Sequence, residues 1–150
     1  MRCAEIKVQT IRESGQEYRV KSPDTVLEFW QSEIVKSSWY DAEKEMMIVL
    51  LVSSKNHVKG YNLVTIGIVD ASLCHPREVF RPAIIAAAAS IILVHNHPSG
   101  DATPSNEDIV ITKQVKSAGD IIGIRLLDHV IIGNNKQSSM RESGLVDFNK

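Results

Sequence analysis

Apolar positions along the chain fall into continuous runs and into repeats, and the two patterns predict different elements. Residues 46–52 form an unbroken apolar run, which is typical of a strand buried on both faces of a sheet. After a turn at residues 54–57, apolar and polar side chains alternate through residues 58–68, and this predicts the antiparallel return strand. A longer apolar stretch, residues 83–94, is shorter than the ~20 residues that span a bilayer, so we divide it between a helix and a strand.

Three segments have helical spacing of apolar residues or a helix-start signal. Ser22 and Pro23 open the first, and the apolar spacing continues to about Val35. His75-Pro76 opens the second, with Pro82 in an early turn and an alanine tract that favours helix up to Ala89. The third begins near Asn106, ends before Gly119, and is expected to pack through Ile109, Val110, Thr112 and Val115. The predicted helices are 22–35, 75–89 and 106–118.

The remaining segments are short. Residues 121–127 and 130–132 are predicted as two strands, residues 133–135 as a turn, and residues 137–150 as a polar extension with little core. Residues 5–11 and 17–20 resemble an edge hairpin. No internal repeat or low-complexity linker is present, so we expect a single α/β (α+β) domain, in which one mixed sheet is flanked by helices.

Composition narrows the function classes. The 150 residues are 43% apolar and 23% charged, which suits one compact domain. A net charge of −1 removes the simplest argument for nucleic-acid binding, although a local basic patch stays open. Cys3 and Cys74 and the absence of a secretory signal favour reduced thiols in a soluble, cytoplasmic protein.

Candidate chemistry is concentrated where residues 91–94 end in His95-Asn96-His97. Residues i and i+2 of a strand point to the same face, so both imidazoles can aim at one point. The Pro- and Gly-containing loop that follows can fold back and bring Asp108 towards them. Two nitrogens and one carboxylate leave a fourth coordination position for water, which is typical of a catalytic zinc site.

Two alternatives stand beside this interpretation. A single histidine is more often a hydrogen-bonded core or surface residue than a ligand, and we interpret His75 and His129 in that way. Ser105-x-x-Asp108 also fits a capping box, which arises for purely structural reasons. The spacing excludes the nuclease class named after His-Asn-His, whose residues are not consecutive, and the metallo-β-lactamase pattern, which needs Asp and His where Ser99 and Gly100 stand.

His95-x-His97, seven residues and then Ser105-x-x-Asp108 match the JAMM (MPN+) metalloprotease motif at every fixed position. The fuller string HNHPSGDATPS, with HPREVF upstream and LLDH downstream, resembles the RadC-like branch of that superfamily. The resemblance implies the MPN/JAB (cytidine-deaminase-like) architecture with a mostly antiparallel sheet. It also implies one zinc ion per chain on His95, His97 and Asp108, with Ser105 holding the oxyanion or the bound water.

The family also needs an upstream glutamate as general base and acid, just before a buried strand. Glu45 stands immediately before the apolar run and is our choice, with Glu43 in reserve. The implied reaction is hydrolysis of a peptide, isopeptide or related amide bond. Cys74 is interpreted as a packed thiol, because no motif pairs it with a base.

This chain differs from the longer RadC-like proteins in its N-terminal part. Their helix-hairpin-helix region has no counterpart in the front of this chain, where we expect only an extension over about residues 1–22. The alternatives to a hydrolase are a DNA-associated accessory protein and a non-catalytic MPN binding module. The expected substrate is a peptide or protein of unknown identity. A DNA partner and a homodimer stay open, and no membrane partner is expected.

Overall fold

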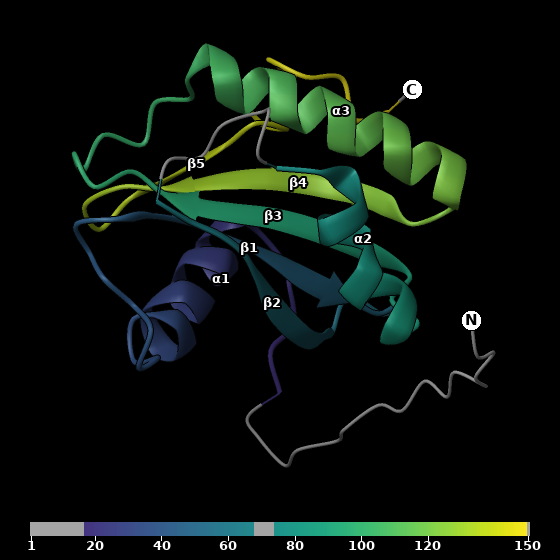
Figure 1. Ribbon diagram of the computed structural model, residues 1–150, viewed down its shortest axis with the longest axis horizontal. Coiled ribbons are helices and arrows are strands. Elements are labelled where there is room, and N and C mark those ends of the chain that lie inside the picture. The colour runs from purple at the N-terminus through teal and green to yellow at the C-terminus, as the bar shows by residue number, and fades with distance from the viewer. Residues whose placement is uncertain (1–16, 68–73, 150) are drawn as a thin grey trace, which may run out of the picture.

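The computed structural model describes residues 17–67 and 74–149, which form one five-stranded mixed sheet flanked by helices (Figure 1). Its strand order is β2-β1-β3-β4-β5. β3 and β4 are parallel, and the other neighbouring pairs are antiparallel. The expected mixed, mostly antiparallel sheet is therefore confirmed. The strands are β1 (Glu45–Val52), β2 (Val58–Gly67), β3 (Ser90–Asn96), β4 (Arg125–Ile132) and β5 (Gln137–Ser139).

Helices cover both faces of the sheet. One face carries α1 (Pro23–Phe29), which continues into a π-helix, η1 (Trp30–Ile34). The other carries α2 (Pro76–Ile85) and α3 (Asn106–Ile122). Alternate residues of β1 enter the two cores: Met47 packs with α2 and α3, whereas Met46 packs with α1. Two covered faces explain why the sequence of β1 is apolar without interruption.

The same alternation sorts the residues at the end of β3. Leu93 enters the core beneath α3, so His95, two positions on, points to the same face. Val94 enters the core beneath α1, so Asn96 points to the opposite face. Because β1 and β3 are antiparallel and Met47 pairs with His95, the start of β1 lies beside the end of β3. This edge of the sheet holds the candidate site.

Two predicted boundaries at the end of α3 are wrong. Gly119 lies inside the helix, where a Cβ would stand 2.5 Å from the backbone oxygen of Ile124, so the glycine permits close packing instead of ending the helix. The helix ends at Gly123, which adopts a left-handed conformation with φ of +82°. Residues 121–122 are therefore helical, and the two predicted strands 121–127 and 130–132 are one strand, β4.

The buried face of α3 is also rotated from the predicted one. Val110 is 45% exposed, whereas Ile111 is fully buried. The buried positions of this helix are Asp108, Ile111, Thr112, Val115 and Gly119. The face that meets the sheet therefore begins with a carboxylate and continues through a hydroxyl.

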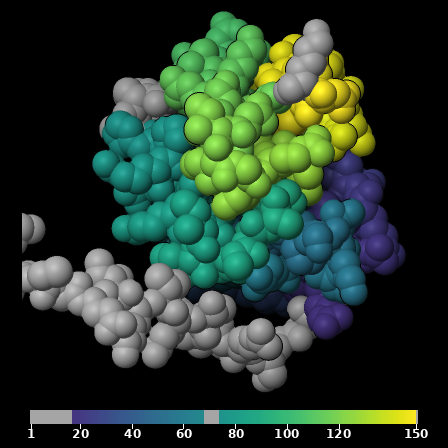
Figure 2. Space-filling model, turned by 90° about the vertical axis from the view of Figure 1, so that its right-hand side faces the viewer, coloured from purple at the N-terminus to yellow at the C-terminus, as the bar shows by residue number. Residues whose placement is uncertain are grey.

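Two further segments differ from the prediction. α2 ends at Ile85 and not at Ala89, because Ala87 has a positive φ of 48° that turns the chain into β3. The tail is not a bare extension: it contains β5, and Met140 and Phe148 are buried in the core beneath α3. Figure 2 faces the end of the molecule where β3 and β4 begin, and there the last turn of α3 lies beside α2.

The N-terminal predictions fall partly outside the described residues. The strand expected at residues 5–11, and with it the hairpin, lies outside them. Residues 17–20 do not form a named strand, but Arg19 makes an isolated antiparallel bridge with His57. No helix in residues 17–67 and 74–149 is long and apolar enough to cross a bilayer.

Candidate metal centre

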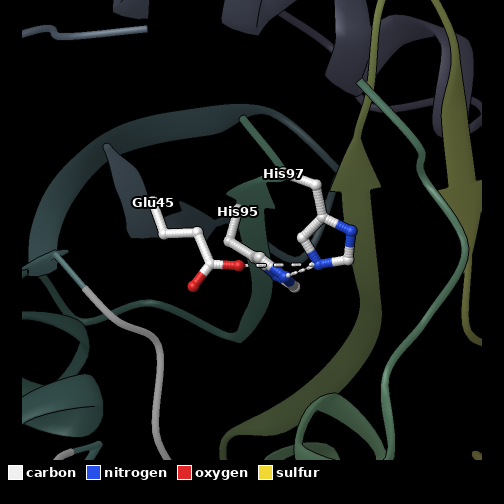
Figure 3. A group of neighbouring side chains, drawn as sticks. All are labelled: Glu45, His95 and His97. Atoms are coloured by element: carbon white, nitrogen blue, oxygen red, sulfur yellow. Dashed lines mark hydrogen bonds and ion pairs between the residues drawn. The ribbon is translucent and has the colours of Figure 1, made fainter. Parts of the chain in front are cut away.

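Three predicted site residues meet where β1 begins and β3 ends. Figure 3 shows the carboxylate of Glu45 and the imidazoles of His95 and His97 directed towards one another. Their ligand atoms all lie within 4.8 Å of one another. The two Nε2 atoms are 2.9 Å apart, and Nε2 of His97 is 3.8 Å from Oε1 of Glu45. Glu43 is exposed and is not part of this group, so the geometry favours Glu45 over the reserve.

Asp108 reaches the same point from the first turn of α3. Its Oδ1 is 3.2 Å from Nε2 of His95, and its Oδ2 is 3.4 Å from Nε2 of His97. The side chains of His95 and Asp108 are 0% and 3% exposed, so solvent does not separate them. The loop that follows β3 therefore folds back as the sequence predicted.

Ser105 is the N-cap of α3. Its Oγ accepts a hydrogen bond of 3.1 Å from the backbone N–H of Asp108, and its own N–H donates to Oδ2 of Asp108 at 2.7 Å. This is the reciprocal pattern of a capping box, so the structural interpretation of Ser105-x-x-Asp108 is confirmed. Because Oγ is the acceptor in that pair, the hydroxyl hydrogen of Ser105 is still available to donate.

Backbone contacts fix the orientation of His97. Its N–H donates to the carbonyl of Ile132 at 2.9 Å, and its carbonyl accepts from Gly100, which has a φ of +83°. This turn brings the carbonyl of Asp101 within 2.7 Å of Nδ1 of His97. A carbonyl can only accept, so Nδ1 carries the hydrogen, and Nε2 is left with its lone pair facing His95.

The donor set fits a small cation of zinc type. Four ligands placed tetrahedrally at the usual zinc distances lie roughly 3.3 Å from one another. The two Nε2 atoms are 2.9 Å apart, Oδ1 of Asp108 is 3.2 Å from Nε2 of His95, and Oδ2 of Asp108 is 3.4 Å from Nε2 of His97, so each separation is near that value. Two imidazole nitrogens and one carboxylate oxygen are also ligands that zinc accepts. The residues present therefore fit the group that the motif implies.

The electrostatics point the same way. Burial acts to raise the pKa of the Asp108 carboxyl, but its interactions with the imidazoles of His95 and His97, when these carry positive charge, outweigh burial and hold that pKa well below its usual range. The hydrogen bond with Asp108 raises the pKa of His97 above its usual value, against the effect of burial. Both shifts describe a point where positive charge is stabilised, whether a proton or a metal ion carries it.

Asn96 is a site residue that the sequence reasoning missed. It is 5% exposed and stands on the opposite face of β3 from the two histidines. Its Oδ1 accepts from the backbone N–H of Met46 at 2.8 Å, and its Nδ2 donates to the carbonyl of Lys44 at 3.0 Å. The amide thus clamps the backbone on both sides of Glu45. An asparagine in an apolar strand position was the signal, since a buried amide needs partners.

His129 and Cys74 have the structural roles predicted for them, whereas the side chain of His75 does not make the expected hydrogen bond at the helix start. His129 is fully buried and hydrogen-bonds His95 at 2.8 Å, behind the group of ligand atoms. His75 is exposed at the N-cap of α2, and its side chain makes no capping bond. Cys74 is buried, and burial raises the pKa of its thiol to about 11, so it is not a nucleophile at neutral pH.

A cavity of about 340 Å³ adjoins His97. Its walls come from α1, η1 and the loops that follow β3 and β4, with Leu27, Trp30 and Val35 among the apolar residues and Asn134 and Asn135 among the polar ones. None of the described residues that line it is Lys, Arg, Asp or Glu. The cavity therefore suits a neutral group.

Comparisons with known proteins agree with this geometry. The family model for RadC-like JAB domains matches residues 20–145. A UPF0758 protein of Staphylococcus epidermidis is 52% identical over 114 residues, which cover 76% of this chain and 50% of that protein. A UPF0758 protein of Desulforamulus reducens is 50% identical over 113 residues, which cover 75% and 50%. The UPF0758 protein CT0611 of Chlorobaculum tepidum is 48% identical over 128 residues, which cover 85% and 55%. The chain spans about half the length of these curated relatives.

Proposed function

The chain belongs to the RadC-like JAB domain family, and from this membership and the site geometry we propose that it is a zinc-dependent hydrolase of peptide, isopeptide or related amide bonds. One observation carries the proposal. The imidazole nitrogens of His95 and His97 and the Asp108 carboxylate converge at separations of 2.9 to 3.4 Å, close to those of tetrahedral zinc ligands, and the Glu45 carboxylate stands 3.8 Å from Nε2 of His97.

His95, His97 and Asp108 would hold the ion, and Glu45 lies beside them, with its Oε1 3.8 Å from Nε2 of His97. Zinc, when bound there, supplies an acidified water and polarises a carbonyl. Glu45 would take the proton of the attacking water and return it to the departing amine. With its side chain 26% exposed, Glu45 can exchange protons with solvent between turnovers.

Ser105 would stabilise the negative charge that develops on the carbonyl oxygen. Its hydroxyl accepts in the capping box, so its hydrogen is not used there. A single preorganised donor of this kind typically contributes ~10²–10³ in rate. The substrate segment would continue into the cavity beside His97, where a neutral side chain keeps its binding energy and a charged one loses solvation without gaining a partner.

The experiment is a comparison of purified protein before and after removal of metal. We expect about one zinc per chain by elemental analysis, hydrolysis of members of a library of peptide and isopeptide substrates, loss of both after dialysis against a chelator, and recovery on addition of zinc. Protein that stays folded, binds no zinc and cleaves no substrate would contradict the proposal. Zinc binding without cleavage would favour a non-catalytic binding module, in which Glu45 would have no catalytic role.

A further inference from the structure

His129 lies directly behind His95 and has no route to substrate. Its exposed fraction is 0%, and it stands within β4 between Asp128 and Val130. Its Nε2 is 2.8 Å from Nδ1 of His95, and its Nδ1 is 2.6 Å from Oγ1 of Thr112. Both ring nitrogens are therefore engaged by groups from two other elements, β3 and α3.

The direction of these hydrogen bonds follows from Thr112. A hydroxyl has one hydrogen, and that of Thr112 goes to the backbone carbonyl of Asp108 at 2.6 Å. Oγ1 of Thr112 must therefore accept from His129, so Nδ1 of His129 carries the hydrogen. Nε2 of a neutral His129 then has a lone pair, and it accepts from Nδ1–H of His95.

The consequence appears at the far side of the His95 ring. With its hydrogen on Nδ1, His95 presents the Nε2 lone pair to Asp108 Oδ1 and to His97. The hydrogen-bonded path thus begins at the backbone carbonyl of Asp108, passes through Thr112 and His129, and ends at Nδ1 of His95, joining α3, β4 and β3. On the far side of the ring, Nε2 of His95 is 3.2 Å from Oδ1 of Asp108, and a cation held between these two atoms would complete a loop.

We infer that Thr112 and His129 are positioning residues for the metal: they fix the tautomer and ring orientation of His95 and hold it in register with Asp108. The inference rests on the proposed function, because it takes His95 and Asp108 as ligands. Partners that orient a ligating histidine in this way are typically worth 10–100-fold in metal affinity. A role in packing alone would leave the affinity unchanged.

The test is zinc affinity, measured by competition with a fluorescent chelator on the full chain. Thr112→Val keeps the shape of the side chain and removes the hydroxyl, and we expect a loss of about 10–100-fold in affinity. Thr112→Ser restores the hydroxyl and should bind within about threefold of wild type. Ser139→Ala is the matched control: it removes a buried hydroxyl that bonds Asp128 at 2.6 Å, on the other side of β4, and should leave affinity unchanged.

A second readout is independent of zinc. Long-range ¹⁵N–¹H correlation spectra of histidine-labelled protein should show the hydrogen of His129 on Nδ1, with or without metal. Hydrogen on Nε2, or equal zinc affinity in Thr112→Val and wild type, would overturn the inference while leaving zinc binding and the proposed function intact. A wild-type chain that binds no zinc would overturn the proposed function, and the inference with it.

Discussion

The three residues proposed as ligands are more enclosed than the residue proposed as base. The side chains of His95, Asp108 and His97 are 0%, 3% and 13% exposed, and each is oriented by a further hydrogen bond. Glu45 is 26% exposed, and Asn96 holds the backbone on either side of it. A metal site needs fixed donors in a dry environment, whereas a residue that carries protons needs contact with solvent.

Removal of one of the three enclosed residues proposed as ligands has the largest expected effect. His95→Ala should abolish stoichiometric zinc, with affinity more than ~100-fold weaker, since even the partners of ligands are worth 10–100-fold. Hydrolysis should disappear with the metal. Elemental analysis after dialysis measures the first and the library assay the second. His75→Ala is the control, because His75 is exposed at the start of α2, and it should keep its zinc.

Neutralising the proposed base should separate hydrolysis from zinc binding. Glu45→Gln keeps the size of the side chain and removes its basicity, so hydrolysis should fall by ~10²–10⁴ while zinc content stays at one per chain. Glu43→Gln, two residues earlier and exposed, should behave like wild type. If the effect moves to Glu43, the assignment of the base is wrong although the metal site stands.

Loosening the backbone around Glu45 should have a smaller effect. Asn96→Ala leaves the N–H of Met46 and the carbonyl of Lys44 without their partner, and we expect roughly 1–3 kcal/mol less stability in urea denaturation. A displaced carboxylate should lower kcat by about 10-fold or more, since small misplacements are costly in catalysis. Zinc affinity should stay within about threefold. If Asn96→Ala loses zinc and keeps kcat, Asn96 supports the metal ligands and not Glu45.

Ser105 gives the smallest effect on stability. Loss of the cap in Ser105→Ala should cost ~1 kcal/mol in the free energy of unfolding, and Ser105→Asp should retain most of it, because aspartate is also a good N-cap. Neither variant can donate a hydrogen bond to an oxyanion. Equal loss of hydrolysis in both, with stability lost only in the alanine variant, would therefore separate the catalytic role from the capping role. Ser105→Thr should retain both roles.

The sequence predicted most of the architecture because burial leaves clear patterns. The unbroken apolar run of β1 reports two covered faces, and the turn residues 54–57 report its antiparallel return into β2. The errors came where packing overrides local signals. Gly119 is a helix-ending residue by type, but here close approach to Ile124 requires it inside α3. The polar tail contributes Met140 and Phe148 to the core, which its composition did not indicate.

In the candidate site, too, residues close in sequence could be predicted, whereas contacts between distant segments could not. Spacing along the chain predicted that His95, His97 and Asp108 would meet, since all three lie around one strand end and one loop. The position of Asn96 in an apolar strand indicated that its amide needs partners, but the partners of Asn96 and Thr112 could not be predicted, because they depend on which elements are neighbours in the fold. A hydrogen bond between Asn96 and Met46 crosses from β3 to β1, 50 positions earlier.

That separation also bears on the order in which the molecule assembles. His95 and His97 are two positions apart, and Asp108 follows on the next element, so their meeting closes only a short loop of chain. Bringing β1 beside β3 closes a much longer one, and the entropy cost of closure grows with loop length. During synthesis or refolding, the ligand residues can therefore gather before Glu45 arrives. A chain at that stage would hold the proposed zinc ligands together and would still lack the proposed base.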